Sequence, residues 1–352
     1  MLTHVTLAVQ DGLGLELTSG EYAALLVGLL SAFGWGLGCL LFDRLQTKRG
    51  GTSPLEERGI VAPTAAAMNL FKNTVACTVF VLVAVAIGLF ATMGVGSAPV
   101  WPAAGAAWLL FLSGIAGFAI GDAMYFASFP KAGVQLAAMI GNLTPPLAAL
   151  LSWLFLDERI ETAALLWMAV IVFGISLVVM DPVANPKQAG RTVEPRERLV
   201  GAGYALVSAL AQAVGIVVTF KAAEGVDVLP ATIWRLVGGI ALAVPIALVL
   251  ARGKGTPARE ALGTLTRPLR SRPLFLLLLV PTFVATILCL PLHTFAVRGA
   301  PAHLSALVLA TSPLFILPLG RFFHARHGWL SVVGTLIGFG GLAGVLLYSA
   351  PA

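Results

Sequence analysis

Ten apolar segments, separated by polar connections, follow one another along the chain. None of them alternates apolar and polar residues with a period of two, so the pattern predicts helices rather than a β-barrel. Each segment approaches or exceeds the roughly 20 residues that a helix needs to cross a bilayer. The chain is therefore predicted to be an all-α polytopic membrane protein. The expected spans are 22–42, 64–92, 104–127, 132–156, 161–180, 200–222, 228–251, 273–297, 300–323 and 329–349.

The fourth segment carries a helix-breaking sequence in its middle, Thr144-Pro145-Pro146. Proline removes a backbone donor and clashes with the preceding turn, which predicts a kinked or locally opened helix. Lipid tolerates freed carbonyls where other helices or a wetted cavity satisfy them. The ninth segment repeats the pattern as Thr311-Ser312-Pro313, at an offset of 167 residues from Thr144.

The polar segment 181–199 divides the chain into two halves of five spans each. An odd number of spans per half makes the second copy enter the membrane from the opposite face, which is an inverted repeat around a central path. The predicted units are a non-cytoplasmic segment 1–21, a first repeat 22–180, the linker 181–199 and a second repeat 200–349. Weak matches support the repeat: Ser31, Trp35 and Gly38 align with Ser208, Gln212 and Gly215, and Asn69, Phe71 and Lys72 align with Thr232, Trp234 and Arg235.

Composition agrees with a membrane location. The 352 residues are 58% hydrophobic and 11% charged, whereas soluble proteins carry about 25% charged residues. The net charge of +6 comes from short connections between spans and is not a nucleic-acid signal. Basic residues favour the connections that follow odd-numbered spans, which predicts that these are cytoplasmic and that both termini lie outside.

Polar residues inside spans are the candidates for function. Asn69, Lys72 and Asn73 lie at i, i+3 and i+4, so they form one stripe that should face the interior or a cavity. Lys72 contacts an anionic substrate group or gates the path in one interpretation, and snorkels to the interface in the other. Arg235, one turn after Thr232, stays charged and needs a partner or water.

Further candidates lie on the first, third, sixth and eighth spans. Asp122 follows three glycines at helical spacing and precedes Tyr125 by one turn. Its carboxylate either exchanges a proton during transport or neutralises Lys72 or Arg235. His293 is a proton relay or a hydrogen-bonded structural residue. The last two candidates are Trp35 and Gln212, which would line the cavity as an aromatic wall and as a hydrogen-bonding group; the alternative for Trp35 is packing in the core.

These features resemble the drug/metabolite transporter superfamily, specifically EamA-type members with two five-helix repeats. The resemblance rests on Gly34-Trp35-Gly36, on a basic residue in the second span of each half, and on the mid-helix Pro146. The closing pair Glu158-Arg159 and a glycine-bearing helix around Gly174 complete it; the second half has His324-Ala325-Arg326 in place of the acidic pair. The resemblance implies ten helices around a central cavity and ATP-independent transport of small metabolites, often export. The family's usual orientation, with cytoplasmic termini, is opposite to the one that the charges predict.

The predicted function is secondary transport of a small metabolite by alternating access, in a bacterial inner membrane. Expected partners are the substrate, the bilayer and a coupling proton, with no nucleic acid, and the chain acts as a monomer or a homodimer. No enzyme motif such as a Walker A loop or H-E-x-x-H occurs, and no cofactor or metal is expected. The alternatives are a membrane enzyme acting on lipid-linked substrates and a scaffold.

Overall fold

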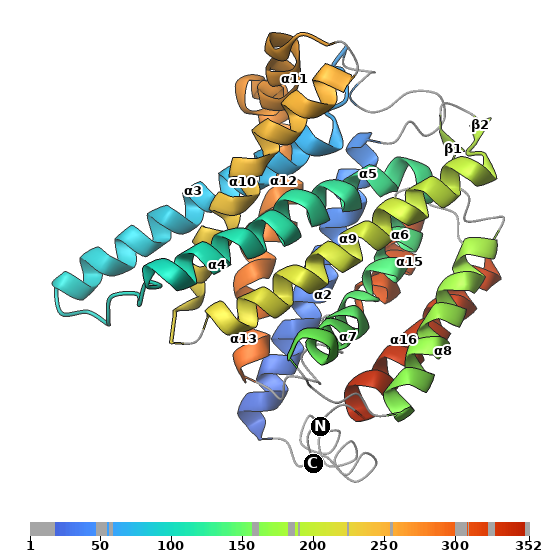
Figure 1. Cartoon of the computed structure of the whole chain (residues 1–352), viewed down its shortest axis with the longest axis horizontal. Helices are drawn as coiled ribbons and strands as arrows, with labels where there is room; N and C mark the ends of the chain where they lie inside the picture. Colours follow the sequence, from blue (N-terminus) through green and yellow to red (C-terminus); the bar gives the residue numbers. More distant parts are fainter. Residues whose placement is uncertain are drawn as a thin grey trace.

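The computed structural model is a bundle of long helices (Figure 1). It describes residues 18–46, 55, 59–156, 162–181, 187–188, 191–223, 225–253, 256–299, 308, 310–322 and 328–348. Among these, seven helices are long and apolar enough to cross a membrane, and two shorter apolar helices, Leu166–Val178 and Trp329–Gly344, accompany them.

A helix or part of one lies in every range that the sequence predicts to span. The helices of the first half are α2 (Ser19–Gln46), α3 (Ala65–Thr92), α4 (Ala104–Gly114), the π-helix η2 (Ile115–Gly121), α5 (Asp122–Ala132), α6 (Val134–Gly141), α7 (Thr144–Leu156) and α8 (Thr162–Met180). Those of the second half are α9 (Pro195–Ala222), α10 (Val228–Gly253), α11 (Ala258–Arg270), α12 (Arg272–Thr282), the π-helix η3 (Phe283–Leu288), α13 (Cys289–Gly299), α15 (Ser312–Phe322) and α16 (Trp329–Tyr348).

Two elements in the connections were not expected. The predicted polar connection 252–272 contains α11, whose apolar side buries Leu265 and Pro268 while Arg259 and Arg270 stay exposed. The predicted linker contains a small antiparallel hairpin, β1 (Lys187–Gln188) and β2 (Arg191–Thr192). Because α9 begins at Pro195, the sixth helix also starts earlier than predicted. Proline suits the first turn of a helix, where its missing N–H has no partner to lose.

The fourth span breaks just before its prolines. Helix α6 ends at Gly141, two turn residues follow, and α7 begins at Thr144. The expected opening is confirmed, but the single span 132–156 is replaced by two helices, and Gly133, with φ +82°, separates α6 from α5. The prolines 145 and 146 occupy the first turn of α7 and cost no helical hydrogen bonds there. The turn at 310–311, before α15, stands at the corresponding place in the second half.

A wide π-turn interrupts the third and the eighth span. The two π-helices begin at Ile115 and Phe283, 168 residues apart, which is within one residue of the offset between Thr144 and Thr311. Such π-turns are rare and occur frequently at functional sites. Both halves therefore carry the same irregularity at corresponding positions in the sequence.

Helices pack across the two halves in a reciprocal way. Helix α2 contacts α13 and α15, while α9 contacts α5 and α7, so the first helix of each half packs on the third and fourth helices of the other. The α8–α16 pair lies together at one side of the bundle (Figure 1). Glycines allow this pair to approach closely: a Cβ on Gly174 would lie 2.5 Å from the backbone nitrogen of Gly338.

Candidate functional site

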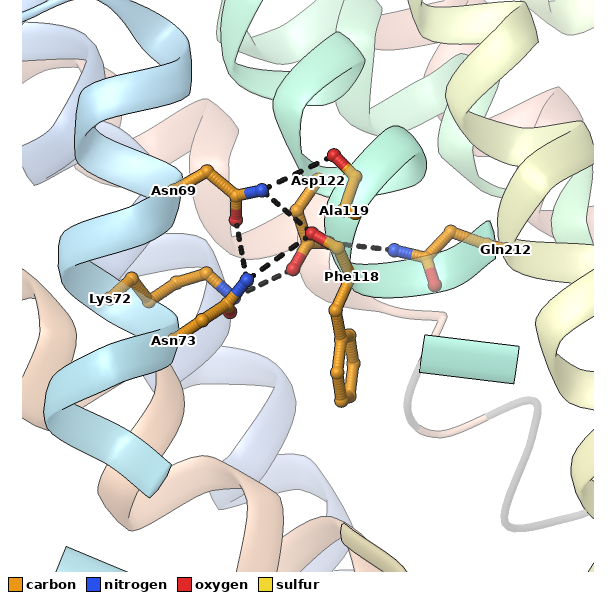
Figure 2. Close-up of polar contacts among 7 residues, drawn as sticks. All are labelled: Asn69, Lys72, Asn73, Phe118, Ala119, Asp122 and Gln212. Carbon is orange, nitrogen blue, oxygen red and sulfur yellow. Dashed lines mark hydrogen bonds and ion pairs between the residues drawn. The ribbon is translucent and has the colours of Figure 1, made fainter. Parts of the chain in front are cut away.

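The polar stripe of α3 faces η2 (Figure 2). Asn69, Lys72 and Asn73 are all buried, so the predicted inward orientation is confirmed. The Nδ2 of Asn69 donates to the Phe118 carbonyl at 2.7 Å and to the Ala119 carbonyl at 3.4 Å. Asn73 donates to the Phe118 carbonyl as well, at 3.3 Å. The stripe thus donates to two backbone carbonyls of η2.

Asp122 stands immediately after the π-turn and receives two side-chain donors. The Nζ of Lys72 lies 2.6 Å from Asp122 Oδ2, with side-chain exposures of 3% and 4%. The Nε2 of Gln212, from α9, donates to Oδ1 at 2.7 Å (Figure 2). Lys72 therefore does not snorkel to the interface. Of the two partners proposed for Asp122, the structure selects Lys72.

Glycines bring α9 and α10 against this segment. A Cβ on Gly114 would collide with the carbonyl of Arg235, and one on Gly121 would lie 3.2 Å from the Gln212 side chain. A Cβ on Gly117 would lie 3.0 Å from Gln212 Oε1 and 3.5 Å from an Arg235 terminal nitrogen. The predicted close approach at these three glycines is confirmed, and it places Gln212 and Arg235 next to Asp122.

Arg235 stacks its guanidinium on the Phe118 ring, with Cζ 4.5 Å from the ring centroid. Such a stack stabilises the cation by a cation–π interaction of about 0.5–2 kcal/mol. Its Nε is buried and has no hydrogen-bond partner among the described residues. Asp122 and His293 both lie within electrostatic range of the guanidinium.

The accessible polar side chains face inward rather than toward lipid. His293 is exposed, yet it stands two residues before Phe295, which is 56% exposed, and residues two apart on a helix face nearly opposite sides. Gln212 lies likewise between the exposed Leu210 and Val214 on α9. These two residues and the partly exposed Arg235 therefore face the bundle interior.

Trp35 and Tyr125 form an aromatic wall beside the ion pair. Their rings stack with centroids 6.3 Å apart and an interplanar angle of 18°. Tyr125 is buried and lies one turn after Asp122, while Trp35 is partly exposed. Trp35 thus packs in the core with one side and leaves the other accessible. Thr232 is partly buried on α10, one turn before Arg235.

The two broken helices meet at their breaks. The Nδ2 of Asn142 donates to the carbonyl of Ala310 at 3.0 Å. Thr144 Oγ1 donates to the Ala209 carbonyl of α9 at 3.4 Å, and Thr311 Oγ1 donates to the Val308 carbonyl at 2.6 Å. Side chains at each break therefore donate to carbonyls of a turn or of a neighbouring helix.

Comparison with known proteins decides the family. A model of the EamA-like transporter family matches residues 59–180 and 199–347. The chain belongs to the EamA-like transporter family. It is therefore an integral membrane protein of the drug/metabolite transporter superfamily, as the sequence pattern indicates, and its general function is membrane transport. No match was found among curated protein sequences.

A solved structure, described only as the crystal structure of a protein, resembles this EamA-like transporter over nearly its full length. The match covers 93% of this chain and 97% of that one, with a TM-score of 0.55 and 18% identity. At this identity the likeness shows the fold alone.

The transporter also holds a buried polar junction that sequence reasoning missed. Arg198 was counted with the basic linker, but it is buried near the start of α9 and donates to the carbonyls of Val178 (2.8 Å) and Asp181 (3.0 Å). The carboxylate of Asp181 accepts from the backbone N–H of Ser331 at 2.9 Å, in the first turn of α16. One signal was available in the sequence. Asp181 directly follows the predicted span 161–180, and Arg198 stands two residues before the predicted span 200–222.

Several residues that carry the sequence resemblance lie outside the described residues. They are Glu158, Arg159, His324, Ala325 and Arg326. Within the described ranges no group of three or more His, Cys, Asp or Glu residues could hold a metal ion. Cys39, Cys77 and Cys289 are free thiols, and the first and last of them are buried.

Proposed function

We propose that this chain is a secondary active transporter that carries a small metabolite through the bundle by alternating access between two inverted five-helix repeats. The substrate would bind where α9, α10, α13 and the segment after η2 face one another. The observation that carries this proposal is the interior polar core: Gln212, Arg235 and His293 are accessible yet face away from lipid. Polar side chains inside a membrane protein are costly unless they meet partners or water, and they commonly mark substrate pathways.

The two halves support the alternating-access part of the proposal. They share a π-turn and a helix break at nearly the same offset, and they pack reciprocally. Repeats of this kind can rock against each other around a fixed central site. Ten spans, cytoplasmic odd-numbered connections, a bacterial inner membrane and export as the direction belong to the same proposal. Two complete repeats form a path within one chain, so a monomer suffices.

The core divides into two groups with different proposed roles. Lys72, Asp122, Asn69 and Asn73 are buried and bonded to one another or to η2. They would fix the π-turn and hold Gln212 in place. The accessible Gln212, Arg235 and His293 would contact the substrate, with Trp35 as an aromatic wall. Asp122 would take up a coupling proton only when substrate or rocking of the repeats displaces Lys72.

Metabolite profiling of cytosol and medium tests the proposal. Cells expressing the wild type would be compared with cells expressing Arg235→Ala at equal membrane abundance. The matched control is Arg270→Ala, which removes an exposed arginine at the end of α11. We expect a compound to move between compartments with the wild type and the control but not with Arg235→Ala. Equal profiles for all three strains and for cells lacking the protein would refute the transport role, and a change in lipid composition would favour the lipid-linked enzyme.

A further inference from the structure

The polar core contains one more positive than negative charge. Lys72 and Asp122 form a 2.6 Å ion pair and cancel each other. Arg235 then remains, and Asp122, already paired with Lys72, is a carboxylate within electrostatic range of it. No carboxylate lies within ion-pair distance of its guanidinium in the described part of the chain. The described part of the core therefore carries one positive charge, that of Arg235, without an anion to balance it.

Arg235 has few ways to relieve this imbalance. A guanidinium cannot be deprotonated in proteins, and Phe118 covers one of its faces. Its Nε is buried without a partner among the described residues. An unsatisfied donor of this kind is costly, and a positioned acceptor would remove the cost. The Nε and a terminal nitrogen of arginine together match the two oxygens of a carboxylate.

The surroundings of the guanidinium suit a bound molecule. Arg235 is partly exposed, and the exposed His293, which faces inward on α13, lies within electrostatic range of it. Gln212 also lies near the guanidinium, and its Nε2–H donates a hydrogen bond to Asp122 Oδ1. Its Oε1 is then left near Gly117, beside the arginine, as an acceptor for a neutral donor group. A substrate that meets this set brings one negative charge and at least one N–H or O–H donor.

From this we infer that Arg235 binds the carboxylate of a small organic monoanion, and that such acids are the substrate class. The inference rests on the proposed transport function and adds the chemistry of the substrate to it. A carboxylate brings one charge and cancels the excess. A phosphate monoester brings about two charges at neutral pH and would leave the core negative.

Flux measurements with matched acid and amide pairs test this inference. The purified protein would be reconstituted in liposomes loaded with three pairs: lactate and lactamide, benzoate and benzamide, and N-acetylalanine and its amide. The variants are Arg235→Gln, Arg235→Lys and the control Arg270→Gln. We expect flux of one or more acids but not of their amides, a loss of about 10- to 100-fold in Arg235→Gln, and partial retention in Arg235→Lys. Arg270→Gln should behave as the wild type.

The outcomes separate this inference from the transport proposal. Flux of an amide equal to that of its acid, unchanged in Arg235→Gln, would overturn the anion inference and leave transport intact. Absence of flux for every compound would overturn transport of these acids, and the same pairs would then be tested for binding to the purified protein by thermal shift. Stabilisation by an acid over its amide, lost in Arg235→Gln, would keep the anion site. No such preference would overturn it.

The melting temperature without ligand gives a second readout. A structural role for Arg235 predicts a lower melting temperature for Arg235→Gln, whereas the proposed binding role does not. If Arg235 is an unpaired cation that awaits an anion, Arg235→Gln should melt at the same temperature as the wild type or higher. A drop of several degrees, comparable to that of Lys72→Met, would show that Arg235 holds the bundle together. That result would contradict the proposed role.

Discussion

The Lys72–Asp122 pair should hold α3 against η2. The substitution Lys72→Met should therefore lower the free energy of unfolding. At 2.6 Å and an effective dielectric constant of about 20, two unit charges attract by about 6 kcal/mol. Desolvation of each ion offsets several kcal/mol of this gain. The intact pair is therefore worth little net, but removal of one partner leaves the other ion buried and unpaired. We expect Lys72→Met to lower the free energy of unfolding by about 3–5 kcal/mol.

A double-mutant cycle distinguishes this reasoning from a simple packing effect. Asp122→Asn should cost a similar amount, because Lys72 would then be the unpaired ion. In the double variant Lys72→Met/Asp122→Asn, both charges are gone and the Asn oxygen can still accept from Gln212. We expect the double variant to be more stable than either single variant, with a coupling energy above about 2 kcal/mol. The assay is reversible unfolding of the purified protein in mixed micelles.

The control is Lys131→Met at the end of α5, where Lys131 is partly exposed. It should cost less than about 1 kcal/mol, as surface charges do. Additive effects of the two core substitutions would refute the pair as a coupled unit. A cost below about 1 kcal/mol for Lys72→Met would refute its burial as a charged pair.

Three other substitutions test the packing around the core. Gly114→Ala should reduce transport and lower stability by about 1–3 kcal/mol, measured by flux and by melting, because its Cβ collides with the Arg235 carbonyl; Gly105→Ala, with no neighbour within 4 Å, is the control. Asn142→Leu should cost about 1–3 kcal/mol in melting experiments, since the Ala310 carbonyl loses its donor; an unchanged melting temperature would show that water replaces the amide. Arg198→Met should destabilise the protein by a comparable amount because the carbonyls of Val178 and Asp181 each lose a side-chain donor, whereas the exposed Arg196→Met should not.

The sequence was sufficient to predict the helices and the inward polar stripe. The length of the apolar segments predicts the spans. The i, i+3, i+4 spacing of Asn69, Lys72 and Asn73 predicts which side of the helix avoids lipid, because exposure of polar groups to hydrocarbon is costly. The glycines before Asp122 also predicted a close helix contact correctly. In each of these cases one helix contains the whole signal.

The π-turn and the partner of each charge could not be predicted in the same way. A π-turn adds one residue to a helical turn, and the apolar pattern of the third span hides it because nearly every position there is apolar. Whether Asp122 neutralises Lys72 or Arg235 depends on how three helices approach, so both pairings were compatible with the sequence. The breaks were located near the prolines, but the helix restarts at Thr144 because proline fits a first turn better than a helix interior.

Arg198 shows why the position of a basic residue in the sequence does not by itself reveal its role. A basic residue at the end of a span normally reports orientation, and Arg198 has three other basic residues within its predicted linker. Its role as a buried donor to the end of α8 depends on where that helix ends in space. The positive-inside count therefore included a residue that is fixed inside the protein.

The most direct test of the account is counterflow in liposomes that contain this protein alone. A small metabolite identified by profiling would be trapped inside, and entry of its labelled form would be followed for the wild type and for Gln212→Leu, which removes the amide beside Asp122 and Arg235 but introduces no charge. The account predicts saturable exchange by the wild type and almost none by Gln212→Leu at an equal amount of folded protein. Exchange that does not saturate, or that continues unchanged in Gln212→Leu, would contradict a transport path through this polar core.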